Sequence, residues 1–132
     1  MKKLLVIFAC ILVYTACDDE PTSYLYVLKN NTSHKVSVQV YSAGFTEEQF
    51  SVAANSYYEK RLDWYNNFSL ISTYADSVKI NFDATKNLTF YRDSINQNHN
   101  IYEASSYSLV GDRERLKVYY YNLTEDDYNA AK

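Results

Sequence analysis

Glycine is scarce in this chain of 132 residues, which contains only Gly44 and Gly111. Phosphate-binding loops and the nucleophile elbow of α/β-hydrolases each need several glycines at fixed spacing. Neither motif can be written in this sequence, so sites of both kinds are excluded. Asparagine and aspartate replace glycine in the stretches KNNTSH, WYNNF and NQNHN, because their side chains tolerate the left-handed backbone region and favour turns.

Cysteine and positive charge are also in short supply. The only cysteines, Cys10 and Cys17, lie in or directly after the N-terminal apolar segment, so we expect no disulfide in the rest of the chain. Without Lys2 and Lys3, 11 basic residues remain against 16 acidic ones, a formal net charge of −5. There is no basic stripe, so nucleic acid is a poor partner. We expect no cofactor either.

Long apolar runs are absent, and the one run present is short. Lys2 and Lys3 precede an apolar stretch over residues 4–14, whereas a membrane-spanning helix needs roughly 20 residues. A positive start, a short apolar region and the small residues Thr15 and Ala16 are typical of a signal peptide. We therefore predict a signal peptide over residues 1–16, of either the lipoprotein or the ordinary secretory kind.

The end of this segment, YTAC at residues 14–17, resembles the lipobox of bacterial lipoproteins. The resemblance implies that Cys17 is lipidated and becomes the new N-terminus, anchored without spanning because two or three acyl chains hold stably. Asp18, Asp19 and Glu20 resemble the acidic export signal of many Bacteroidetes lipoproteins, which implies display on the outer face of the outer membrane. The alternatives are a solvated spacer or, in an enterobacterium, retention at the inner membrane.

The domain organisation follows: a signal peptide over 1–16, an acidic tether over 17–23 and one domain over 24–132. The stretches LKNNTSHKVSVQVY, DSVKINFDATKNLTFY and YYYNLTEDDYNAA, together with the tether, resemble a group of small uncharacterised Bacteroidetes lipoproteins. This resemblance implies neither an activity nor a catalytic residue.

Alternation of apolar and polar residues dominates the domain. KVSVQVY at 35–41 has the period of a half-buried strand, and DSVKINFDATKNLTFY at 76–91 has the pattern of a hairpin. YLYVLK at 24–29 is apolar on both faces, which predicts a central strand covered on two sides. RLKVYYYN at 115–122 predicts a long strand whose three consecutive tyrosines point to alternating faces.

The remaining segments complete an all-β chain. A hairpin is predicted from Phe50 through AANS to YYEKRL, and further strands within IYEASSYSLV and SLISTY. About eight strands at this spacing predict an immunoglobulin-like (Ig-like) β-sandwich of antiparallel strands. LTEDDYNAAK predicts a short C-terminal helix with Thr124 as N-cap, docked by Tyr128 and Ala131, in which Asp126 and Asp127 act in capping rather than as a metal pair.

Candidate catalytic residues are few. His34 and His99 lie in polar turn sequences, where a histidine is more often a turn residue than a base. Ser33 beside His34 is no dyad, because adjacency in sequence does not place a hydroxyl on the imidazole. Glu47 and Glu48 are consecutive, and no third ligand stands at metal spacing. We therefore expect neither an enzyme nor a metal site.

One loop has the composition of a ligand site. Asp63, Trp64, Tyr65, Asn66 and Asn67 combine aromatic rings with carboxylate and amide groups, the chemistry needed to stack on a sugar and bind its hydroxyls. The alternative is that the single tryptophan plugs one end of the core. The sequence thus predicts a lipid-anchored envelope module that binds a glycan or another ligand, or else a structural lipoprotein that packs against a partner protein.

Overall fold

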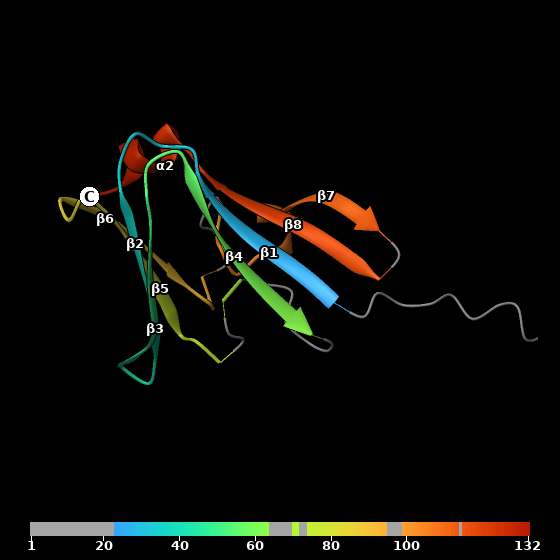
Figure 1. Cartoon of the computed structure of the whole chain (residues 1–132). Coiled ribbons are helices and arrows are strands. Elements are labelled where there is room, and N and C mark those ends of the chain that lie inside the picture. Colours follow the sequence, from blue (N-terminus) through green and yellow to red (C-terminus); the bar gives the residue numbers. More distant parts are fainter. Residues whose placement is uncertain (1–22, 64–69, 72–73, 95–98, 114) are drawn as a thin grey trace, which may run out of the picture.

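The computed structural model describes residues 23–63, 70–71, 74–94, 99–113 and 115–132. Two four-stranded sheets form a sandwich, and Figure 1 shows them meeting near the C-terminal helix and diverging away from it. The first sheet has the order β4-β1-β8-β7. Its strands are β1 (Ser23–Asn30), β4 (Ser56–Asp63), β7 (Ser108–Arg113) and β8 (Leu116–Leu123).

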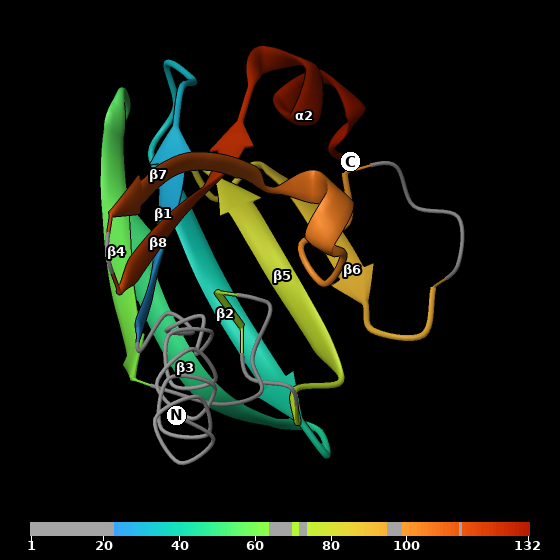
Figure 2. The same ribbon diagram turned by 90° about the vertical axis from the view of Figure 1, so that its right-hand side faces the viewer.

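The second sheet has the order β3-β2-β5-β6 and is antiparallel throughout. Its strands are β2 (Val36–Ser42), β3 (Phe45–Val52), β5 (Ser77–Phe82) and β6 (Lys86–Tyr91). Figure 2 shows this sheet behind the first one, with α2 (Glu125–Ala130) at the end where the sheets approach each other. A 3-10 turn, η1 (Ala104–Ser106), precedes β7.

The period-two pattern of the sequence produces the core directly. The valines of β2 and the apolar residues of β5 are fully buried, and Leu70, Ile71 and Ile101 fill the space between the sheets. Burying each such side chain contributes about 1.5–3 kcal/mol. The buried side chains on the second sheet's inner face are Val36, Val38, Val40, Val52, Val78, Ile80, Phe82 and Phe90.

Tyrosine supplies much of the first sheet's inner face. The rings of Tyr26 and Tyr119 stack at 5.5 Å, and Tyr107 meets Tyr26 edge-on at 5.7 Å. Tyr121 is fully buried, and its hydroxyl donates to the carbonyl of His99 at 2.8 Å. Burial raises the pKa of Tyr26 and of Tyr121, so both hydroxyls stay neutral. The abundance of tyrosine is thus explained partly by core packing.

The predicted fold class is confirmed: the described chain is an all-β sandwich of eight strands with one short C-terminal helix. One pair differs from the antiparallel expectation, because β1 and β8 run parallel in the centre of the first sheet. The likeness to an immunoglobulin domain therefore extends to general build and not to strand order, since such domains pair their first two strands in one sheet, whereas β1 and β2 lie in different sheets.

Of two further segments predicted as strands, one contributes only its last residues to a strand, and the described residues of the other contribute none. IYEASSYSLV contains η1 and contributes only its last residues to β7. In SLISTY, Leu70 and Ile71 are buried but outside the strands. Both segments contribute buried apolar residues to the core cluster, so burial there does not require a sheet partner.

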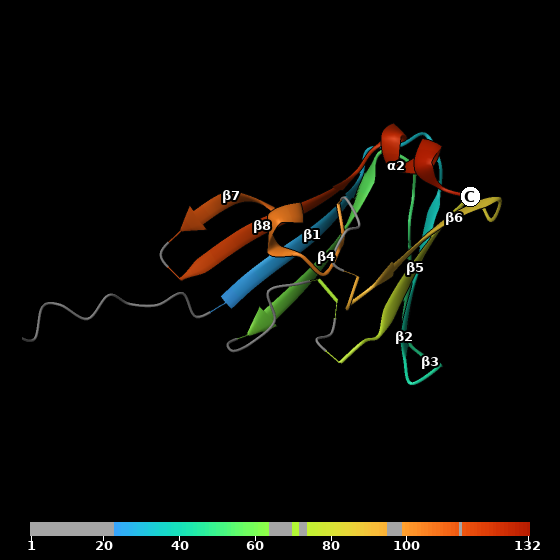
Figure 3. The ribbon, with the colours of Figure 1, turned by 180° about the vertical axis from the view of Figure 1, so that it is seen from behind.

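The C-terminal helix closes the end where the sheets meet, as Figure 3 shows from behind. Thr124 is its N-cap, and the ring of Tyr128 packs edge-on against Phe82 at 5.6 Å. After the helix, Asn87 and Lys132 exchange backbone hydrogen bonds of 2.8 and 3.1 Å, and Ala131 is buried. The predicted cap and the predicted docking residues of the helix are thus confirmed.

Candidate functional sites

Most residues of the predicted sites lie outside the described part of the chain. These are the lipidation site Cys17, the acidic residues Asp18, Asp19 and Glu20, and the loop residues Trp64, Tyr65, Asn66 and Asn67. Asp63 is described as the last residue of β4, where it pairs in register with Ser23, the first residue of β1. The C-terminal end of β4 therefore lies beside the N-terminal end of β1.

The first histidine joins three segments at the α2 end. Nδ1 of His34 lies 2.6 Å from Oδ2 of Asp83, in the β5–β6 turn, and Nε2 lies 4.0 Å from Oε2 of Glu125 at the start of α2. The ring also stacks on Tyr128 at 3.7 Å and 16°. Glu125 in turn accepts the backbone N–H of Ser33 at 2.7 Å. His34 therefore fastens the helix to two turns.

A buried amide holds this turn in place. Asn30 is fully buried, and its side-chain amide donates to the carbonyls of His34 and Ala53 at 2.8 and 2.9 Å. Its side-chain oxygen accepts the hydroxyl of Thr32 at 2.7 Å. The KNNTSH stretch is thus a turn built around a satisfied polar group, as its composition predicts. The backbone N–H of Ser33 donates to Glu125, which ties this turn to α2.

Hydrogen bonding sets the acidity of the His34 partner. The hydrogen bond from His34 is the main cause that lowers the pKa of Asp83, and the backbone N–H of Lys35 lowers it further. Lys86 lies 4.5 Å from the centre of the Tyr128 ring, so positive charge also approaches this cluster. These contacts hold α2 against the turns that contain His34 and Asp83.

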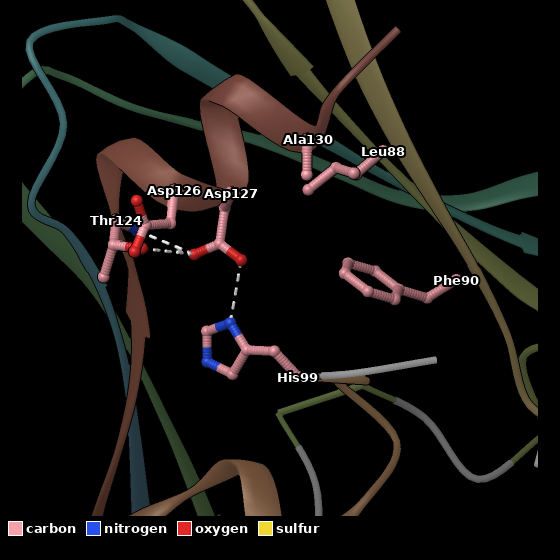
Figure 4. A pocket seen from close by; sticks show the side chains of 7 residues that line it. All are labelled: Leu88, Phe90, His99, Thr124, Asp126, Asp127 and Ala130. Atoms are coloured by element: carbon pink, nitrogen blue, oxygen red, sulfur yellow. Dashed lines mark hydrogen bonds and ion pairs between the residues drawn. The ribbon is translucent and has the colours of Figure 1, made fainter. Parts of the chain in front are cut away.

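The second histidine lies beside a pocket of about 350 Å³. Figure 4 shows Leu88, Phe90 and Ala130 on the apolar side, and His99 with Asp127 opposite them. Nδ1 of His99 lies 2.9 Å from Oδ1 of Asp127, and the imidazole stacks on Tyr121 at 4.5 Å and 9°. The pocket thus combines an apolar wall with one polar pair.

Asp127 forms hydrogen bonds with both His99 and Thr124. Its Oδ2 accepts the backbone N–H and the hydroxyl of Thr124, at 2.8 and 3.0 Å. The hydroxyl therefore bonds to the carboxylate, whereas a catalytic triad needs it on the imidazole. Although burial opposes the shift, hydrogen bonds from His99 and Thr124 lower the pKa of Asp127. The arrangement is that of a helix cap braced by a histidine.

Replacing Asp127 by asparagine should lower the free energy of unfolding at pH 7 by about 1–2 kcal/mol, because charged hydrogen bonds are lost. A carboxylate with a depressed pKa in the folded state stabilises the protein above its unfolded pKa of about 3.9, and this contribution disappears as the pH falls through the folded pKa. The stability difference should therefore begin to shrink near pH 4 and vanish only below the depressed folded pKa of Asp127, as measured by urea unfolding at several pH values.

Asp126→Asn is the matched control, because Asp126 is exposed and adjacent in the helix. We expect a loss of only about 0.3 kcal/mol, the contribution of an exposed charge in the first helical turn. A difference for Asp127→Asn that persists at low pH would show that the carboxylate charge is not what stabilises the cap.

The outer faces of the two sheets differ in chemistry. The outer face of the second sheet is largely polar, as strand alternation predicts; its residues include Ser37, Gln39, Gln49, Ser51, Lys79, Asn81, Asn87 and Thr89. On the first sheet, the outward positions of the two central strands hold Leu25, Val27, Val118 and Tyr120. Val27 is only 4% exposed although it lies outside the core cluster.

The apolar outer face of the first sheet differs from what the sequence predicts for β1. YLYVLK predicted a strand covered on both faces, and β1 is indeed central, but the described residues add no third layer over its outer side. Tyr119 and Tyr121 face the core, so Tyr120 points outward, where Lys29 lies 5.0 Å from its ring. The histidine–carboxylate pairs had no sequence signal, because their members lie 28 and 49 residues apart.

Within the described ranges, no group of three or more histidine, cysteine or acidic residues could hold a metal ion. Of the helices in those ranges, none is long and apolar enough to cross a membrane.

Comparison with known proteins gives no match of any kind: no family model, no curated protein and no solved structure matches the chain. The function is therefore argued from the residues and geometry of this chain itself.

Proposed function

We propose that this protein is a lipid-anchored, non-catalytic module of the bacterial cell envelope, held by Cys17 on the outer face of the outer membrane and working through protein contact. The observation that carries the proposal is the position of β1. It begins at Ser23, at the end of the sandwich away from α2 (Figure 1). Residues 17–23 reach only about 20 Å when extended, so an anchored domain would sit close to the bilayer with α2 pointing away.

The absence of catalysis is supported by how the polar groups are used. His34 and His99 are both paired with carboxylates and stacked on tyrosines. The hydroxyl nearest to the second pair, that of Thr124, is bonded to Asp127. Each of these groups helps to fasten α2. Among the contacts described, no nucleophilic side chain is hydrogen-bonded to either imidazole.

Protein contact is favoured over glycan binding by the surface chemistry. A partner protein needs an apolar surface with a polar rim, which the outer face of the first sheet offers through the half-buried Leu25, Val118 and Tyr120. The glycan alternative depends on the loop after Asp63. Because Asp63 pairs with Ser23, that loop would start at the end nearest to the bilayer, where a large polysaccharide has least access.

Intact cells treated with an external protease should lose the domain, because the acidic tether directs it to the outer surface. Changing Asp18, Asp19 and Glu20 together to alanine should protect it, and immunoblotting measures the difference. Cells with a permeabilised outer membrane are the control, since both proteins should then be degraded. Equal protection of both proteins in intact cells would contradict surface display through these carboxylates.

A further inference from the structure

Apolar side chains lie on the outer face of the first sheet, three of them half-buried and Val27 only 4% exposed, although no third layer of described residues covers that face. We call Leu25, Val27, Val118 and Tyr120 the β1–β8 patch. Leu25 pairs in register with Val118, and Val27 with Tyr120, so the four side chains form two adjacent rows on one face. None of them belongs to the core cluster or to the residues packed against it. The patch is therefore an apolar surface on the outside of the sandwich.

The surroundings of the patch resemble the rim of an interface. Lys29 follows Val27 on the same face of β1. On the neighbouring strand β4, Glu59 pairs in register with Val27, and Arg61 pairs with Leu25. Tyr57 is 60% exposed on β4, and Val110 is 51% exposed in the bulge of β7. Gly111 lies opposite Val118, where an added Cβ would meet the Val118 side chain at 3.3 Å. The missing side chain leaves Val118 accessible from the β7 edge.

We propose that a second copy of this chain docks on the β1–β8 patch, with the two first sheets face to face. The proposal rests on the lipid anchor proposed above, which would hold all copies in one plane with their strands in a similar direction. A two-fold axis along the strands, between β1 and β8, keeps both tethers on the same side. It also places β1 of each copy over β8 of the other.

Under this two-fold symmetry, residues that pair in register within one sheet face each other across the interface. Because Leu25 pairs with Val118 and Val27 with Tyr120, each apolar row of one copy faces the same row of the other. The charged residues around the patch meet no like charge in this arrangement, because Lys29 faces Asn122, Glu59 faces Ser108 and Arg61 faces Gly111 of the other copy. The second sheet's polar outer face offers no such match.

The size of the surface predicts a weak dimer that needs the membrane. Three strands of eight residues and one of six, about 4.8 Å apart, make a face of at most about 480 Å². Two such faces bury about 1,000 Å², at the lower limit for a specific interface. Anchoring in one plane raises the effective concentration and compensates for the small area. We therefore expect dimers in the membrane and monomers in dilute detergent solution.

Single cysteines test the proposal in membranes that contain the full chain. Facing sheets lie about 10 Å apart, which is beyond the reach of a disulfide, so a short bismaleimide is the crosslinker. Val118→Cys places a thiol in the patch. Ser37→Cys places one on the polar face of the second sheet, at a half-buried position like Val118. We expect about tenfold more crosslinked dimer from Val118→Cys than from Ser37→Cys.

Three results would overturn the second-copy proposal: equal crosslinking of both variants, crosslinking of Val118→Cys only to a different protein, or no reaction of Val118→Cys because the bilayer covers it. The wild type tests the anchor separately, because a lipidated Cys17 has no free thiol. Crosslinking of the wild type would refute the anchor. The patch is then tested in solution with Val118→Cys in a Cys17→Ser chain at high protein concentration, where absence of a dimer refutes it.

Discussion

Tyr121→Ala should lower the free energy of unfolding by about 3–5 kcal/mol, the usual cost of removing a large buried ring. Tyr121 is fully buried, stacks on His99 and donates its hydroxyl to the His99 carbonyl. The substitution leaves a cavity between the sheets and an unsatisfied carbonyl, and it releases the histidine that braces the Asp127 cap. Chemical denaturation followed by circular dichroism measures the loss.

Tyr120→Ala is the matched control, because it removes the same side chain from the adjacent residue on the opposite face. Its ring contacts Lys29 on the outer surface and not the core, so we expect a cost below about 1 kcal/mol in dilute solution. Equal losses for the two variants would contradict the assignment of inner and outer faces in β8.

Cys17→Ser should abolish incorporation of a clickable fatty acid and retain the signal segment, because the lipid is attached through the cysteine sulfur. Losing two or three acyl chains removes the lipid's share of membrane binding, about 0.8 kcal/mol for each buried methylene. Fluorescence of the labelled band on a gel measures the incorporation, and the size of the band measures cleavage.

Cys10→Ser is the control for this experiment, because it changes the only other cysteine of the chain, which lies inside the predicted signal peptide. We expect it to be labelled and cleaved like the wild type. A fatty-acid label that survives in Cys17→Ser would refute the lipoprotein proposal.

Local pattern was sufficient to predict much of the fold. The alternation in KVSVQVY and in the hairpin at 76–91 appears as β2, β5 and β6, with the valines and Phe82 buried. The cap at Thr124 was predictable because capping depends on residues close in sequence. Pairing between distant strands was not, since the parallel contact of β1 with β8 joins the two ends of the domain and has no local signature.

In the candidate sites, too, local features could be predicted from the sequence, whereas contacts between distant segments could not. Both histidines were predicted as turn residues, and their sequences do form turns, but their partners Asp83 and Asp127 come from distant segments. The β1–β8 patch was visible as apolar residues on both faces of YLYVLK. Whether the outer side of such a strand is covered depends on the third dimension, so the sequence could not separate a doubly buried strand from a strand with a docking surface.

The intact mass of the protein extracted from cell membranes tests the central claim most directly. The lipid-anchored account predicts a mature chain that begins at Cys17 and carries the additional mass of two or three acyl chains on that residue. A chain that begins elsewhere, or that begins at Cys17 with the mass of the unmodified polypeptide, would contradict it.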